Sequence, residues 1–115
     1  MIIPAVYVHC GVGILLAAIS VPLVLRRVPP NHVYGIRIPE AFSTEARWYD
    51  INAYGGRLFL IYGIALAAFG ALAQDMAPPP DSLWSAVFIT GPLLVPLLLL
   101  LPIRSYARRR VRQGT

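Results

Sequence analysis

The side chains best suited to bind another molecule lie together in one polar segment, residues 28–57. The segment holds two side-chain amides, three arginines and three carboxylates between long apolar runs. Guanidinium and amide groups form strong hydrogen bonds with carboxylates and phosphates. One interpretation is therefore a polar cluster within the segment. Its expected members are Asn31, Arg37, Asn52 and Arg57, with Glu45 or Asp50 as the ion partner.

The same segment also suits a plainer role, which is to anchor the chain at a membrane surface. Trp48, Tyr49 and Tyr54 carry amphipathic rings that favour the headgroup zone of a bilayer. Arginines at that level contact lipid phosphates and bias the orientation of neighbouring spans. Composition alone leaves anchoring and a specific polar cluster both open.

Residue types that commonly perform catalysis are few in this chain. His9 and His32 are the only histidines, and we expect them on opposite sides of a membrane, where they cannot form one site. Cys10 is the only cysteine, which excludes an intramolecular disulfide and any cysteine-based metal motif. There is no HExxH motif and no glycine-rich phosphate loop. We therefore expect no enzyme activity, no bound metal and no cofactor.

Three apolar runs must position the polar segment. The chain is 57% hydrophobic and 13% charged, whereas about a quarter of a soluble domain is charged. About 20 helical residues cross a bilayer core, and the middle run is short, so its helix should begin within 52–57. Pro92 and Pro96 lie inside the third run and predict a kink there. The prediction is one all-α membrane domain, residues 1–115, with spans at about 2–25, 56–73 and 83–103.

The arginines predict how the spans are oriented. Five of the ten arginines lie in a loop at 26–57 and five in a tail at 104–115, whereas the connection at 74–82 has none. The positive-inside rule places loop and tail in the cytoplasm and the N-terminus outside. A net charge of +5 could also attract nucleic acid. Because the charge flanks apolar spans, we expect the lipid bilayer as partner and no nucleic acid.

Small residues predict close helix packing. Gly56, Gly63 and Gly70 recur every seven residues, and Gly13 and Ala17 form a similar pair in the first span. Such residues let membrane helices approach closely. We favour packing within one bundle over a dimer interface, while a homo-oligomer stays open.

The second half of the polar segment has the pattern of a helix. Ser43 is a candidate N-cap, and Glu45 in the first turn suits the helix dipole. We therefore expect an interfacial helix over Thr44–Tyr54. At Gly55 and Gly56 this helix should either continue or kink into the second span.

Two stretches, "PPNHVYGIR" at 29–37 and "EARWYDINAYGGRLFL" at 45–60, resemble the signature of the SdpI-type membrane proteins. That signature is similar to P-N-x-x-Y-G-x-R followed by W-x-x-x-N-x-x-x-G and a membrane span. The matching positions, with the basic residue that follows them, are Pro30, Asn31, Tyr34, Gly35, Arg37, Trp48, Asn52, Gly56 and Arg57.

The resemblance implies a multi-pass protein of a bacterial cell membrane. The family takes its name from an immunity protein that protects a bacterium from its own secreted killing factor. This chain departs from that protein in having one three-span unit, and it has Ile38 where the family pattern suggests Thr. The implied partners are a membrane-active peptide toxin or a cytoplasmic regulator protein. The alternative is a transporter or channel subunit, which would have to oligomerise because three spans make a poor pore.

Overall fold

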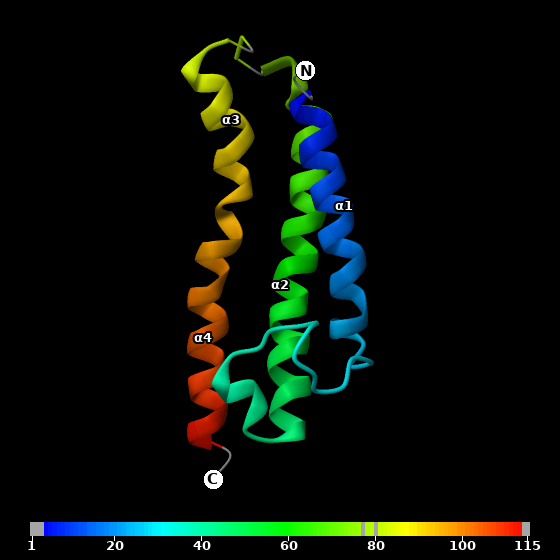
Figure 1. Cartoon of the computed structure of the whole chain (residues 1–115), viewed down its shortest axis with the longest axis vertical. Helices are drawn as coiled ribbons and strands as arrows, with labels where there is room; N and C mark the ends of the chain where they lie inside the picture. The colour runs from blue at the N-terminus through cyan, green and yellow to red at the C-terminus, as the bar shows by residue number, and fades with distance from the viewer. Residues whose placement is uncertain (1–3, 77, 80, 114–115) are drawn as a thin grey trace.

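The chain forms a long helical bundle in the computed structural model, which describes residues 4–76, 78–79 and 81–113 (Figure 1). No β-strand occurs among these residues. Three helical stretches, counting α3 and α4 as one, are long and apolar enough to cross a membrane. The predicted all-α fold with three spans is therefore confirmed. The helices are α1 (Ala5–Val24), α2 (Glu45–Leu72), α3 (Leu83–Leu93) and α4 (Val95–Gln113), with short 3-10 turns η1 (Pro39–Phe42) and η2 (Gln74–Met76).

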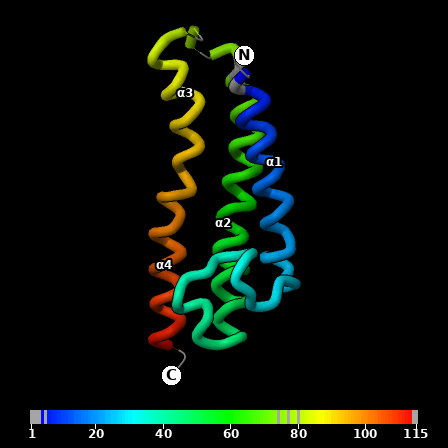
Figure 2. Tube along the Cα trace, viewed as in Figure 1, coloured from blue at the N-terminus to red at the C-terminus, as the bar shows by residue number. Residues whose placement is uncertain are grey.

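Helices α1 and α2 pack side by side along the small residues (Figure 2). A Cβ atom added to Gly63 would lie 2.6 Å from the Gly13 carbonyl oxygen and 2.8 Å from the Ala17 nitrogen. One added to Gly70 would lie 2.8 Å from the His9 Cβ. Side chains larger than hydrogen would force these helices apart. The predicted small-residue seam within one bundle is confirmed.

The third span is interrupted at Leu94, between Pro92 and Pro96. Proline lacks the N–H group that would bond four residues back, so Pro96 leaves the Pro92 carbonyl without its helical donor. The Tyr62 hydroxyl on α2 donates to that carbonyl at 2.5 Å. The helix is interrupted where the two prolines predicted a kink, and Tyr62 on α2 supplies a hydrogen bond there.

His9 joins α1 to α3 near the end of the bundle that is remote from the arginines. Its ring is fully buried and lies against Phe69 and Phe88, with centroid distances of 5.2 and 5.8 Å. The Nε2 atom is 3.0 Å from the Ile89 carbonyl oxygen. The contact matters because α3 has no buried residue of its own.

Apart from His9, the fully buried side chains gather at the arginine-rich end of the bundle. There the loop between α1 and α2 folds back across the ends of α2 and α4 (Figure 1). In each of the three spans most residues are not buried by protein. The loop is therefore packed on the bundle and does not simply connect two spans. The enclosed cluster consists of Ala41, Trp48, Ile51, Ile103 and Ala107.

The N-cap of helix α2 lies one residue later than predicted. Ser43 has helical dihedrals, φ −67° and ψ −37°, whereas an N-cap residue needs an extended backbone. Thr44 has φ −148° and ψ 161°, and its hydroxyl accepts from the Arg47 N–H at 3.0 Å. The Ser43 cap is therefore wrong and Thr44 takes that role. The helix then runs through Gly55 and Gly56 without interruption.

Candidate functional site in the motif loop

The loop that carries the first half of the motif is shaped by Asn31. The Oδ1 atom of Asn31 accepts from the N–H groups of Val33, at 2.9 Å, and Tyr34, at 2.6 Å. Its Nδ2 atom donates to the Pro29 carbonyl at 2.8 Å and to the Tyr34 carbonyl at 3.0 Å. An asparagine that bonds backbone groups nearby replaces a backbone turn. The Asn31 amide is thus used inside the loop.

Asn52 fixes the loop to α2. Its side chain is 2% exposed, and its Oδ1 atom accepts from the Ile36 N–H at 2.6 Å. The Nδ2 atom donates to the Trp48 carbonyl at 3.0 Å and lies 3.4 Å from the Ile36 carbonyl oxygen. One buried amide therefore satisfies both backbone groups of Ile36, which no neighbouring strand pairs.

Gly35 is a position where the loop backbone lies close to α2. Its φ is +116°, which a residue with a side chain rarely adopts. A Cβ atom there would lie 2.8 Å from Asn52 Oδ1 and 3.2 Å from the Trp48 ring. The backbone conformation and the lack of space for a Cβ atom both require glycine at position 35. The glycine of the motif therefore has a physical cause.

Trp48 and Tyr34 complete the attachment. The Trp48 ring is fully buried, and its Nε1–H donates to the Val28 carbonyl at 2.7 Å. Phe42 lies between this ring and His32, with both centroid distances 5.2 Å. The Tyr34 hydroxyl donates to the Ile19 carbonyl of α1. Protein therefore encloses Trp48, whereas an interfacial anchor would present its ring to lipid headgroups.

The motif arginines do not join this network as a charged cluster. Arg37 is exposed and donates to the His32 carbonyl. Arg57 is exposed as well, and no ion pair to either side chain occurs among the residues the structure describes. The hypothesis that Glu45 or Asp50 pairs with these arginines is therefore wrong. Gly56, the last motif glycine, packs on α1, where an added Cβ would be 3.0 Å from Leu23 Cβ.

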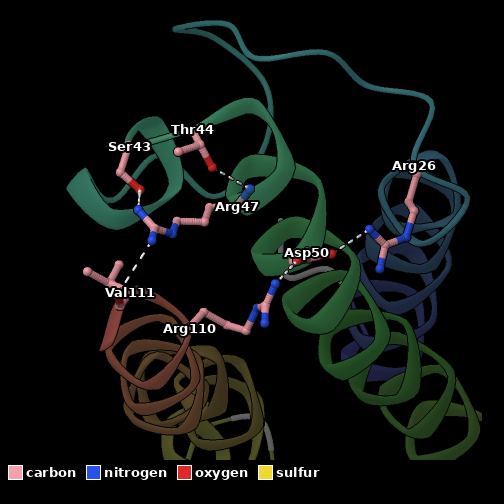
Figure 3. Close-up of polar contacts among 7 residues, drawn as sticks. All are labelled: Arg26, Ser43, Thr44, Arg47, Asp50, Arg110 and Val111. Carbon is pink, nitrogen blue, oxygen red and sulfur yellow. Dashed lines mark hydrogen bonds and ion pairs between the residues drawn. The ribbon is translucent and has the colours of Figure 1, made fainter. Parts of the chain in front are cut away.

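Asp50 instead joins three helix ends. It lies two residues from both Trp48 and Asn52, so it points away from the loop side of α2. Its carboxylate binds Arg26, just after α1, at 2.7 Å, and Arg110 on α4 (Figure 3). Partial burial raises the pKa of Asp50, but the hydrogen bonds and charges of the two arginines outweigh it, and the pKa lies below its ordinary value. Arg26 holds this position with φ +59°.

Further contacts fix the arginine-rich end of α4 to the loop and to α2. Arg47 donates to Ser43 Oγ at 3.3 Å and lies 3.5 Å from the Val111 carbonyl oxygen (Figure 3). Arg104 pairs with Glu40 at 3.4 Å. The Tyr54 and Tyr106 rings stack at 4.2 Å. The expected tail is thus an ordered helical extension through Gln113. None of these partners was predicted, because no local pattern signals pairs so distant in sequence.

A small apolar cavity lies where the motif loop meets α1 and α2. Its volume is about 190 Å³, and Tyr34 and Gly35 from the motif form part of its wall. Asn31 and Asn52 set the loop conformation that closes this wall. The motif therefore shapes a hollow that could receive a large apolar side chain or part of a lipid tail. The lining residues are Leu16, Ile19, Ser20, Leu23, Tyr34, Gly35, Ile36 and Phe59.

These features define a multi-pass membrane protein whose first connecting loop is folded onto the bundle. The sequence model of the SdpI/YfhL protein family matches residues 27–104, which include the whole motif and the last two spans. The chain belongs to this family. Comparison with curated proteins and with solved structures gives no significant match.

Proposed function

We propose that this protein protects a bacterial cell membrane against a membrane-active peptide toxin, without enzyme activity. Family membership supports this role. In the proposed orientation the motif loop and the end of α4 lie in the cytoplasm, because all ten arginines gather at that end.

The observation that carries the proposal is the cavity beneath the motif loop. It lies beside Ile19 and Ser20 of α1, at the border between the loop and the apolar span. A toxin peptide that spans the membrane could place an apolar side chain there from the hydrocarbon side. The polar motif groups would act indirectly, by holding the loop that forms the cavity wall.

The exposed side of the loop supports an associated signalling role. Arg37 and Val33 point outward, and Val33 is 88% exposed. A soluble regulator with a complementary acidic surface could bind there once a toxin occupies the cavity beneath. Arg37 would then contact the regulator, whereas the cavity would bind the toxin.

A killing assay tests the protective role. The chain is expressed in a sensitive bacterium, which is then exposed to membrane-active peptide toxins. Leu16→Trp fills the cavity and should abolish protection, whereas Leu15→Trp, on an exposed position outside it, should preserve protection. Equal protection by both variants would show that the cavity does not bind the toxin. If the unaltered chain gives no protection against any toxin, the proposed immunity function is wrong.

A second assay separates signalling from protection. Arg37→Ala should reduce capture of a cytosolic protein by the purified chain while protection persists. Arg109→Ala, which removes the same charge from an exposed position on α4, should leave both unchanged. Equal effects of the two variants would assign the loop a general anchoring role.

A small transporter or channel subunit is the alternative function. The broken third span favours it, because α3 contributes no buried residue and leaves apolar surface for other copies. Such a subunit would have to oligomerise. A chain that stays monomeric in lipid nanodiscs would exclude this alternative.

A further inference from the structure

A shallow apolar groove runs along the seam between α1 and α2. Its volume is about 420 Å³. Small residues, including Ala17, Ala18 and Gly63, form its floor, and Val21, Leu60 and Ile64 form its sides. From Leu60 to Ala67 the groove extends about 10 Å along the helix axis. Its shape and apolar lining suit a hydrocarbon chain lying parallel to the helices.

Arg57 stands at the arginine-rich end of this groove. It precedes Leu60 by one turn of α2 and Ile64 by two turns, so it shares a face with the groove. Neighbouring Gly56 packs against Ser20 and Leu23, which places Arg57 level with the last apolar turns of α1. A guanidinium at this depth extends toward the membrane surface and needs an anion there.

The nearest ion cluster also carries a net positive charge. Asp50 lies two turns before Arg57 on the same face of α2, and Arg26 and Arg110 converge on it from α1 and α4 (Figure 3). Arg26 and Arg110 share this carboxylate, which leaves two minus one, or one, uncompensated positive charge. Arg57, which has no ion pair among the described residues, adds a second. Basic pockets between membrane helices commonly bind phosphate-bearing lipid headgroups.

We propose that this face binds an anionic phospholipid. Arg57 contacts the headgroup phosphate, and one acyl chain lies in the groove between α1 and α2. A second copy of this chain fits less well, because its equivalent face would bring the same excess positive charge. Arg57 follows Trp48 by nine residues and Asn52 by five, so it lies on the opposite side of α2 from these two motif residues. The headgroup contact therefore does not depend on the proposed protection against a toxin.

Native mass spectrometry of the full chain in detergent tests the headgroup contact. Phosphatidylglycerol and phosphatidylcholine with identical acyl chains are titrated separately. We expect the anionic lipid to bind more tightly, and Arg57→Gln to weaken its binding about tenfold or more, as the loss of a charge-assisted bond implies. Arg109→Gln removes the same charge from an exposed site and should change binding less than twofold. Equal effects of the two variants, or equal binding of the two lipids, would overturn the proposal.

Two further arms test the groove and the source of the phosphate. Ala18→Phe should weaken binding of both lipids, whereas Ala65→Phe, exposed on α2 outside the groove, should not. Retained helical content in both variants shows that they fold. Inorganic phosphate should not displace the lipid. Displacement by phosphate would indicate an anion site without an acyl-chain contact. A protein dimer that Ala18→Phe disrupts and Ala65→Phe does not would indicate that a second copy of this chain occupies the groove. Either result would overturn the proposal.

Discussion

The polar side chains of the motif act on the protein itself. Asn31 and Asn52 direct their amides to the loop backbone, and Trp48 donates its only N–H to Val28. Substituting any of these residues should therefore disturb the loop rather than delete a ligand contact. Among the motif residues, Arg37 and Arg57 are the charged groups that remain available to an external partner.

Asn52→Ala tests this internal role. The substitution removes the acceptor for the partly buried Ile36 N–H, which should cost about 1–3 kcal/mol of loop stability. Hydrogen–deuterium exchange should accelerate over residues 28–42 and stay unchanged in α1. Arg109→Ala is the control and should leave both regions as they are. Unchanged exchange in Asn52→Ala would show that the amide is not what holds the loop.

Asp50 should make the arginine-rich end sensitive to acid. Because its pKa is depressed in the folded state, its stabilising contribution is fully present above the unfolded-state pKa. That contribution is lost as pH falls through the lower folded-state pKa. Thermal unfolding in detergent should therefore lose stability in this acidic range, and Asp50→Asn should remove that part of the pH dependence. An identical pH profile for both chains would contradict the role of Asp50.

At the scale of elements, the helices differ in how firmly they are held. α1 and α2 touch backbone to backbone at Gly13 and Gly63. α3 has no buried residue, and His9 and Tyr62 supply its interhelical hydrogen bonds among the described residues. We therefore expect α3 to open more readily than α1 or α2.

Tyr62→Phe should loosen the joint between α3 and α4. The change leaves the aromatic ring in place but removes the donor to the Pro92 carbonyl, which Pro96 cannot replace. Amide exchange should increase over residues 91–97 relative to α1. Tyr7→Phe, on an exposed position of α1, is the matched control. Equal exchange in the two variants would mean that the hydroxyl does not hold the joint.

Sequence reasoning succeeded where a local pattern carries the cause. Long apolar runs predict spans, glycine every seven residues predicts the seam, and Pro92 and Pro96 predict the break. It failed where two adjacent residues could fill the same structural position, and where contacting residues lie far apart in the sequence. Ser43 and Thr44 both carry a capping hydroxyl, and only the backbone dihedrals decide between them. Asp50 and Arg110 are 60 residues apart, and no periodicity links them.

At the scale of the whole molecule, helix length explains the folded end. The bundle is 54 Å long, whereas a bilayer hydrocarbon core is about 30 Å thick. The 28 residues of α2 extend about 42 Å, so about two turns project beyond the core. Those turns carry Trp48, Asp50 and Asn52, and the loop and α4 cover them. The motif thus organises the part of the protein that emerges from the hydrocarbon.

Tryptophan quenching tests the packed motif loop most directly. The chain has two tryptophans, and Trp84→Phe leaves Trp48 as the sole fluorophore. Trp48 is fully buried in protein, so its emission in vesicles should resist both aqueous acrylamide and brominated acyl chains. The reciprocal variant Trp48→Phe reports on the exposed Trp84, which at least one quencher should reach. Strong quenching of Trp48 by the brominated lipid would contradict the account, because it would place this ring on the membrane surface and not beneath the loop.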